Sequence, residues 1–438
     1  MHIVGHKIFV RMKDIPMYLS KKTKDSIRNR YSHSVEVGLS TEYLLHNVSR
    51  QLGDDINLNF FHIAKIIGLV HDIGHTAFSH DGEVILNQIL QEASASLDKP
   101  VHFNANLNNF RRIEKYGLFD LLPPDAKRYA YASLIKRKNE LQEYPEYIKY
   151  EEDLDYAIAL EHKYLTSKGI EIDHIQNKTI VCQAMDLADE NRYRVTDIID
   201  ALNIYSKEKL IEILRSSITS NVRIKEIRKL VRFKLPDIKG FKQTHSDTIP
   251  IKELLILLLN QESHAKTEFQ NSMNSLSMAF NRNFKLSSKG KLVPLNKEIE
   301  ALRNDFHKIA AKYLWGSKKV DNIKKPFKHY FKTVAEYFIH QDFNIELIDS
   351  STYRNALVSL ENELYPEDVY RRKKLVLLRN FLGGLTNLKI MELFRAIKVE
   401  AFEKKYQTNI AKKEKLIRLV SMKEFEKKLE KYKKRLAA

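Results

Sequence analysis

The sequence predicts an all-α protein, and three observations support this prediction. Only 13 glycines and 10 prolines occur among 438 residues, whereas a β-rich chain of this length needs many tight turns. Hydrophobic residues make up 43% of the chain, an ordinary share for a globular protein, and they recur at helical spacing over long segments. We find no internal repeat and no low-complexity linker. A contiguous helical body is therefore the simplest architecture.

The predicted helices follow one another along the chain. Residues 26–50 carry apolar side chains at helical spacing. Residues 60–71 form a denser apolar run, which is typical of a buried helix and ends at His71. A turn-rich stretch around residues 280–294 leaves room for one short β-hairpin. Further helices are expected over residues 104–118, 176–205, 206–260 and 295–400.

Two segments differ from this body in composition. Residues 123–170 are rich in Tyr, Glu and Lys, and we interpret them as a peripheral helical insertion on the surface. Residues 398–438 hold 14 Lys or Arg and 6 Glu, a local charge of +8 in a chain of formal net charge +18. The expected organisation is a helical domain over residues 1–400 and a basic helical tail over residues 401–438. The basic excess favours polyanionic partners, and the alternative for the tail is a solvated helical face.

Cysteine content and the length of the apolar runs bear on the compartment. The single Cys182 excludes an internal disulfide, which fits a reducing environment. The N-terminal stretch lacks the apolar core of a signal peptide, and the apolar runs are too short to cross a bilayer. We therefore expect a cytoplasmic protein with no membrane partner.

The adjacent pair His71 and Asp72 is the centre of the chemical signal. Such a pair supplies a neutral nitrogen and an anionic oxygen, but it converges on one ion only from a special backbone position, because neighbours on a helix point about 100° apart. A His and an Asp from other helices would complete a four-ligand site, and the candidates are His33 and Asp189. Such mixed ligands suit Mn²⁺, Fe²⁺ or Mg²⁺ better than a structural zinc. Alone the dipeptide is weak evidence, since a buried His is usually a hydrogen-bonded core residue.

Four stretches resemble, in the right order, motifs of the HD-domain deoxynucleoside triphosphate triphosphohydrolases, a bacterial dGTPase-like family. HDIGHTAFSHDGE, residues 71–83, is similar to the family form HDxGHxPFGHxGE. RNRYSHSVEVG, residues 28–38, resembles its R-x-x-H-S-x-E-V helix, and MDLADENRYRVTDIIDAL, residues 185–202, its AD-x-x-x-Y-x-x-x-D helix. LRNFLGGLTNLKIMELF, residues 378–394, resembles its closing D-Y-x-A-G-M-T-D segment. Together the matches cover about residues 26–400.

This resemblance implies an HD-domain helical bundle that assembles as a symmetric homo-oligomer, such as a hexamer. It implies hydrolysis of dGTP or another dNTP to a deoxynucleoside and tripolyphosphate, with help from a divalent ion. The metal ligands that it implies are His33, His71, Asp72 and Asp189. The catalytic residues that it implies are His75, His80, Glu83 and His102.

The stretch that begins at His102 departs from the family at one position. HFNANLNNFRR is similar to HFEGNAQxxR of the dGTP-cleaving branch, in which this His and the following acid assist catalysis. Asn104 stands at the position of the acid, and because an amide cannot carry a proton, either Glu83 or His102 alone serves or turnover is weak. Asn106 and Arg111 match positions of the family, and we take them as candidate substrate-binding residues. Without the resemblance, His102 would be interpreted as a surface loop residue.

Further substrate contacts are expected from the two ligand-bearing helices. The guanidinium of Arg30 suits bidentate binding of phosphate, and the alternative is a solvated helical arginine. Tyr193 and Asp197 follow Asp189 at i+4 and i+8, so all three share a helix face. We expect Tyr193 to pack on the deoxyribose, or simply in the core, and Asp197 to accept from the 3′-hydroxyl. Basic residues near Arg282, or from a neighbouring subunit, are candidates to complete the phosphate site.

Some departures from the family and two rival functions remain open. Ala77 and Ser79 replace Pro and Gly of the long motif, and Asn387, Leu388 and Lys389 depart where the nucleoside pocket is shaped, so the preferred base stays undecided. One rival is another HD phosphohydrolase, a nucleotidase or phosphodiesterase, which would not need the GHxxFxH extension. The other is a nucleic-acid-binding regulatory protein with a degenerate HD fold, favoured by the charge but not by four intact ligands. Binding of single-stranded nucleic acid to a basic surface is compatible with the enzyme as well.

Overall fold

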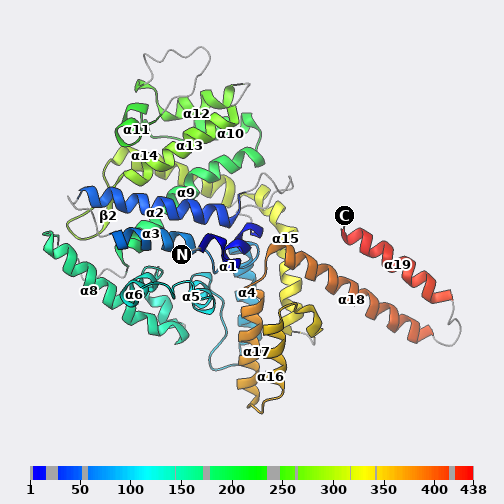
Figure 1. The fold of residues 1–438 in the computed structure, drawn as a ribbon. Helices are drawn as coiled ribbons and strands as arrows, with labels where there is room; N and C mark the ends of the chain where they lie inside the picture. The colour runs from blue at the N-terminus through cyan, green and yellow to red at the C-terminus, as the bar shows by residue number, and fades with distance from the viewer. Residues whose placement is uncertain are drawn as a thin grey trace. The chain divides into compact units, whose positions relative to one another are not determined.

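A computed structural model gives the fold, which is helical apart from one hairpin within the described residues (Figure 1). In the hairpin, β1 (Phe284–Leu286) pairs antiparallel with β2 (Leu292–Pro294), with Lys285 opposite Val293. The all-α prediction and the short hairpin are both confirmed. The structure describes residues 3–15, 28–51, 58–143, 145–170, 178–233, 247–261, 265–315, 317–340, 343–413 and 420–437.

The chain divides into two compact units, each made of two separate segments. The first unit comprises Met1–Gly74 and Asn106–Lys324, and the second comprises His75–Ala105 and Lys325–Ala438. The first segment boundary therefore falls inside the long HDIGHTAFSHDGE motif, after its fourth residue. One helix, α18 (Asn387–Lys413), runs without a break through residue 400, where the sequence analysis places the start of the tail.

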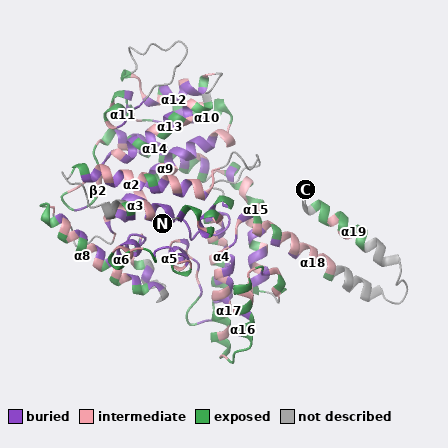
Figure 2. Cartoon of the chain, in the orientation of Figure 1, coloured by how far each residue is buried: buried purple, intermediate pink, exposed green. Residues whose placement is uncertain are grey.

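In the first unit, α2 (Arg30–Gln51) packs against α3 (Leu58–Val70) and α9 (Ile180–Ile204). On the other side, α13 (Ala265–Arg282) and α14 (Lys297–Ala310) pack against α9, whose residues are mostly buried (Figure 2). The unit's other helical segments are η1 (Ile3–Gly5), α1 (Lys7–Val10), η2 (Arg11–Asp14), α5 (Ala105–Lys115), α6 (Pro124–Ala132), α7 (Lys138–Glu143), η4 (Pro145–Tyr150), α8 (Glu151–Ser167), α10 (Lys207–Ser217), α11 (Ile224–Leu230), α12 (Ile251–Asn260) and the π-helical turn Ala311–Trp315.

A pair of glycines lets α2 and α3 approach closely. A Cβ atom added to Gly68 would lie 2.6 Å from the Cα of Gly38, so α3 has no room for a side chain at this crossing. His33 lies more than one turn before Gly38 on α2, and His71 follows Gly68 by three residues. The close crossing therefore brings the N-terminal part of α2 next to the end of α3, which is where the chemistry of this unit lies.

The segment 123–170 is helical, as expected, but it is not confined to the surface. Tyr129, Tyr131 and Tyr150 are buried and belong to the hydrophobic core that α2, α3 and α9 also form. The ring of Phe110 on α5 lies 4.5 Å from the ring of Tyr150, centroid to centroid. Tyrosines are often half exposed, so composition alone concealed this core role.

The second unit begins with a strained turn in the long motif. Phe78 and Ser79 have φ of 60° and 55°, a left-handed conformation that is costly for residues with a side chain. The backbone N–H of Phe78 donates to Asn387 Oδ1 at 2.8 Å, which holds the turn. A Cβ atom on Gly82 would lie 1.9 Å from the carbonyl oxygen of Ala77, so glycine is required there. Asn387, a departure from the family pattern, thus has a structural role in this chain.

The remaining helices of the second unit come from both of its chain segments. The helix after the turn, α4 (Ser79–Ala93), packs against α17 (Glu367–Leu382), which also packs against α16 (Ser351–Glu361). The last part of α15 (Lys318–His340) and η7 (Ile345–Leu347) complete the unit together with α18 and α19 (Val420–Ala437). None of the described helices combines the length and the apolar character that a bilayer span requires.

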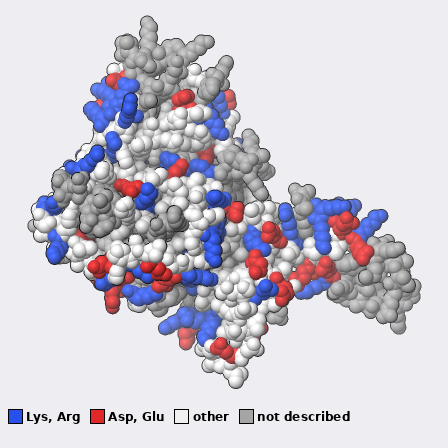
Figure 3. All heavy atoms as spheres, viewed as in Figure 1, with Lys and Arg blue, Asp and Glu red and all other residues white. Residues whose placement is uncertain are grey.

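The charges of the described part of the tail are mixed along its helices (Figure 3). Lys404 Nζ lies 2.7 Å from Glu400, and Lys434 Nζ lies 3.1 Å from Glu430, each one helical turn apart. Between the helices, the rings of Phe402 on α18 and Tyr432 on α19 stack at 4.9 Å. Because part of the positive charge is paired within the tail, the solvated helical face is the simpler account of these residues.

Candidate metal centre

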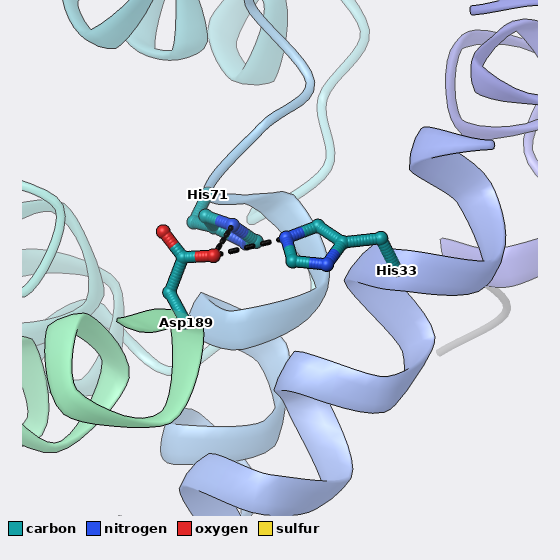
Figure 4. A group of neighbouring side chains, drawn as sticks. All are labelled: His33, His71 and Asp189. Atoms are coloured by element: carbon teal, nitrogen blue, oxygen red, sulfur yellow. Dashed lines mark hydrogen bonds and ion pairs between the residues drawn. The ribbon is translucent and has the colours of Figure 1, made fainter. Parts of the chain in front are cut away.

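Three side chains from three different helical segments converge in the first unit (Figure 4). His33 comes from α2, His71 from the turn directly after α3, and Asp189 from α9. His33 Nε2 lies 2.9 Å and His71 Nε2 lies 3.6 Å from the same atom, Asp189 Oδ1. One nitrogen or oxygen atom of each residue lies within 4.8 Å of the others, which is the spacing of ligands around a single ion.

The imidazole of His71 is held in the tautomer that a metal ligand needs. Its Nδ1 lies 2.7 Å from the carbonyl oxygen of Gly68, which can only accept, so Nδ1 carries the proton and donates. The lone pair is then on Nε2, which is buried and makes no hydrogen bond within the described residues. A backbone carbonyl that orients the ring from behind is a common feature of metal-binding histidines.

Asp72 lies beside these three residues, but its carboxylate forms an ion pair with Arg30. Asp72 Oδ1 lies 3.4 Å from His71 Nε2, and Oδ2 lies 3.7 Å from His33 Nε2. The guanidinium of Arg30, which is fully buried at the start of α2, donates to Asp72 Oδ2. Arg30 also donates to the hydroxyl of Tyr193 at 3.4 Å. The His71–Asp72 pair lies in the turn 71–74 rather than inside a helix, so both side chains can point to one place.

Burial and charge act against each other at these residues. Burial would raise the pKa of Asp189, but His71 and His33 hold it well below its usual range. Burial lowers the pKa of His33. For His71, burial lowers the pKa, but Asp72 and Asp189 more than offset it, so the net direction is upward. The two carboxylates that favour a proton on His71 would also favour a divalent cation in its place.

These residues fit a divalent ion. Two imidazoles and two carboxylates form a mixed nitrogen and oxygen set, and the described residues near them contribute no thiolate, since Cys182 is buried in the core. The orphaned, buried Nε2 of His71 is an atom that a cation would satisfy. Together with the oriented tautomer, this makes the cluster a candidate site for Mn²⁺, Fe²⁺ or Mg²⁺.

Two asparagines that the sequence analysis missed hold the turn 71–74. Asn109 on α5 donates to the carbonyl oxygen of His71 and accepts from the N–H of Gly74, both at 2.5 Å. Asn108 donates to the carbonyl oxygen of Gly74 at 2.6 Å and accepts from Arg111 Nε at 2.9 Å. Both asparagines are buried and hydrogen-bonded. In the sequence, the only sign of this role was that two asparagines stand next to each other shortly after His102.

Besides Arg30, the positively charged side chain of Lys136 lies near the cluster. Lys136, in the segment that the sequence analysis gave no chemistry, has its Nζ 3.7 Å from Asp186 Oδ1 on α9. Burial lowers the pKa of Lys136, but Asp186, Asp189 and Asp72 raise it further than burial lowers it. The charged amine of Lys136 adds positive potential next to the metal cluster.

The face of α9 that carries Asp189 continues as predicted. The ring of Tyr193 lies 4.7 Å from the ring of His33, and the Tyr193 hydroxyl accepts a hydrogen bond from Arg30. Asp197 is fully buried one turn further, with Arg28 Nη2 3.9 Å from its Oδ1. The three side chains at i, i+4 and i+8 therefore share one face of α9.

A second group of ligand-type residues lies in the other unit. His75 Nδ1 and His80 Nδ1 lie 4.0 Å and 3.5 Å from Glu83 Oε2, and the two imidazole rings meet edge to face at 4.7 Å. Glu83 Oε1 accepts from the backbone N–H of Ala105 at 2.7 Å. Burial raises the pKa of Glu83, but hydrogen bonding from His80 and the charge of His75 lower it overall. This group could also hold a cation or relay a proton.

Several proteins of known sequence are similar to parts of this chain. No protein-family model matches it. A deoxyguanosinetriphosphate triphosphohydrolase-like protein 2 of Vibrio cholerae is 29% identical over 182 residues, 40% of this chain and 39% of that protein. A deoxyguanosinetriphosphate triphosphohydrolase-like protein of Clostridium tetani is 34% identical over 118 residues, 26% of this chain and 29% of that protein. A protein of the same name as the first, from Mesorhizobium japonicum, is 26% identical over 230 residues, 46% and 44% of the two chains.

The chain is related to the deoxyguanosinetriphosphate triphosphohydrolase-like proteins. The resemblance predicted from the four motifs is thereby confirmed. The chain spans less than half the length of each of these relatives, and their names describe those proteins. The comparisons and the geometry thus show a chain that is similar to these proteins over part of its length and that carries a candidate metal cluster.

The other predicted residues lie as follows. The ring nitrogen Nδ1 of His102 lies 3.0 Å from Gln91 Nε2, and its carbonyl accepts from Arg379 at 3.3 Å. His102 thus contacts α4 and α17. Asn104 and Asn106 are half-buried. Arg282 lies over the ring of Tyr43 at 4.9 Å and donates to the carbonyl of Leu230, so it serves the packing of α2 and α13.

Proposed function

We propose that this chain is a metal-dependent hydrolase that splits a deoxynucleoside triphosphate into a deoxynucleoside and tripolyphosphate. The observation that carries the proposal is the convergence of His33, His71 and Asp189, with Asp72 beside them, in a chain related to the triphosphohydrolase-like proteins. The preferred base, the native metal, the number of subunits and any nucleic-acid partner remain predictions from the sequence.

The chemistry follows from the residues that surround the cluster. A divalent ion bound there supplies Lewis-acid activation of the α-phosphate and of water. Arg30, which is buried and paired with Asp72, would offer its guanidinium to phosphate oxygens. Lys136 adds a further positive charge. Tyr193 and Asp197 lie on the same face of α9 and would bind the deoxyribose.

The reaction itself balances without any other reactant. A water oxygen forms a bond to the α-phosphorus, and the bond from that phosphorus to the 5′-oxygen breaks. The leaving 5′-oxygen takes a proton, for which His75 and His102 are the predicted donors, and the water proton passes to the medium. The products are a deoxynucleoside and tripolyphosphate.

Product analysis tests the proposal. The protein is incubated with each dNTP and Mn²⁺, and nucleosides, nucleotides and phosphates are separated. Nucleoside with tripolyphosphate supports the proposal; nucleotide with phosphate or pyrophosphate would assign another phosphohydrolase, and no product would favour a binding protein. Asp72→Ala should abolish metal binding and tripolyphosphate release together, whereas Asp155→Asn, with 64% of its side chain exposed on α8, should leave both unchanged.

A further inference from the structure

The carboxylate proposed to bind the sugar is covered by the only tryptophan of the chain. Asp197 has no exposed side-chain surface, and its Oδ2 accepts a hydrogen bond of 2.8 Å from the indole N–H of Trp315. Trp315 itself is 40% exposed, so its ring lies between the carboxylate and solvent. The two residues are 118 positions apart, and no sequence motif connects them.

The backbone places this indole by a rare structure. Trp315 is the last residue of the π-helical turn Ala311–Trp315, which follows α14. Such turns change the direction of the side chains that follow and often occur at functional sites. The hydroxyl of Tyr205, at the end of α9, donates to the carbonyl of Tyr313 at 2.5 Å, which fixes the turn to the helix that carries Asp197. The ring of His307 meets the indole edge to face at 5.2 Å.

The contact with Trp315 uses a position that a substrate would need. A buried carboxylate requires donors, because a charge left without them is costly. Arg28 Nη2, at 3.9 Å from Asp197 Oδ1, gives charge compensation and also pairs with Asp200 at 2.8 Å. The indole N–H gives the direct hydrogen bond. A sugar hydroxyl is likewise a single donor, so it can replace the indole at little net cost.

We propose that Trp315 is a positioning residue for nucleoside binding: its indole N–H holds Asp197 in the ligand-free protein, and the 3′-hydroxyl of a deoxynucleoside takes its place. This inference rests on the proposed function, since it takes a deoxynucleoside as the ligand. A 2′,3′-dideoxynucleoside has no donor at this place, so it leaves the indole on Asp197. Displacement of Trp315 would then indicate that a 3′-hydroxyl is bound, and its free-energy cost would contribute to the selectivity for the sugar.

Fluorescence of the single tryptophan tests the displacement directly. The full-length protein is excited at a wavelength that selects tryptophan and titrated with each dNTP and each matching dideoxy analogue, in EDTA and, by stopped flow, in Mg²⁺. Binding is measured on the same samples by equilibrium dialysis. We expect a saturable change of indole emission with at least one dNTP and a response about tenfold smaller at equal occupancy with its dideoxy analogue.

Three results would overturn the inference. The first is nucleotide bound by dialysis with unchanged emission, the second is an equal change with both kinds of nucleotide, and the third is no binding of any dNTP in either condition. Release of tripolyphosphate is measured separately. Product formed with a silent indole leaves the proposed function standing and removes only the role of Trp315, whereas an indole response without product does the reverse.

A variant separates positioning from general packing. Trp315→Phe keeps an aromatic ring but loses the N–H, so the 3′-hydroxyl no longer has to displace a donor. The ratio of dideoxy to deoxy dissociation constants should then rise about tenfold over that of the wild type. A merely structural loss would weaken both nucleotides equally and leave the ratio unchanged, which would contradict the proposal. Tyr156→Phe, a half-buried aromatic residue of α8, is the matched control.

Discussion

Two histidine–carboxylate groups, which the neighbouring residues His71 and His75 join along the chain, lie in different units and differ in exposure. His33 and His71 have no exposed side-chain surface, and Asp189 has 14%. In the other group, 72% of the His80 side chain and 23% of the Glu83 side chain are exposed. A buried set in which a backbone carbonyl orients the His71 ring is suited to hold an ion, whereas the second group is partly open to solvent. We therefore predict that a metal ion binds to the first group and that the second group acts in proton transfer.

The largest effect is expected from the first group. Asp189→Asn removes the carboxylate that both histidines face, so metal affinity and hydrolysis should fall together, on the order of 10³-fold or more. Metal content after dialysis and initial rates with each dNTP measure the two quantities. Asp155→Asn serves again as the exposed control. Full activity with bound metal in Asp189→Asn would break the comparison.

Glu161 is a buried carboxylate with no histidine among its described hydrogen-bond partners, so its pKa can be compared with that of Asp189. Burial raises the pKa of Glu161, on α8, to about 7, although the hydroxyl of Tyr129 and the N–H of Ile180 donate to it. The folded protein thus binds more protons than the unfolded chain between the ordinary value of 4.5 and about 7. The free energy of unfolding should therefore fall as pH rises through this window, by about 3 kcal/mol at most.

Glu161→Gln should remove this fall. Denaturant unfolding of the wild type and the variant at pH 4.5, 6 and 7.5 gives the difference in slope, and the other titrating groups cancel because both proteins share them. Identical pH dependence in the two proteins would mean that Glu161 is ionised throughout and that burial is outweighed there, as it is at Asp189.

The second group should affect turnover without affecting the metal. His75→Ala is expected to lower kcat about 100-fold, which is typical for loss of an acid–base group, with metal affinity unchanged. Rates and metal titrations on the same preparation check this expectation. His340→Ala, at the exposed end of α15, is the control. A parallel loss of metal would place an ion-binding role in the second group and reverse the assignment.

The smallest effect concerns the turn that carries two predicted ligands. Asn109→Ala loses both hydrogen bonds to the backbone of residues 71–74, so the free energy of unfolding should drop by about 2 kcal/mol. Gln88→Ala, which loses one exposed contact on α4, should change it by less than about 0.5 kcal/mol. Urea unfolding measures both. An equal effect of the two substitutions would show that the turn does not depend on the buried amide.

The sequence predicted those features that depend on local patterns. Scarce Gly and Pro indicated helices, the turn-rich stretch indicated the hairpin, and the ordered motifs indicated the family. His33, His71 and Asp189 were chosen together because each lies in its own motif, and the structure brings them within reach of one ion.

Features that depend on contacts far apart in the chain were missed. The division at Gly74 is invisible in the sequence because each unit is assembled from separate segments. Three interactions join residues that no spacing rule links. They are the ion pair of Arg30 with Asp72, the hydrogen bonds of Asn109 to the turn 71–74, and the hydrogen bond of Trp315 to Asp197. Buried tyrosines of the segment 123–170 were taken for surface residues, because their composition is equally common there.

The central claim is that one divalent ion binds to His33, His71, Asp72 and Asp189. A crystal of the protein grown with Mn²⁺ and measured at the manganese absorption edge tests it most directly. We predict one strong anomalous peak within about 2.3 Å of these four side chains, with Asp72 turned from Arg30 toward the ion. A peak at His75, His80 and Glu83 instead, or none at the four predicted ligands, would contradict it.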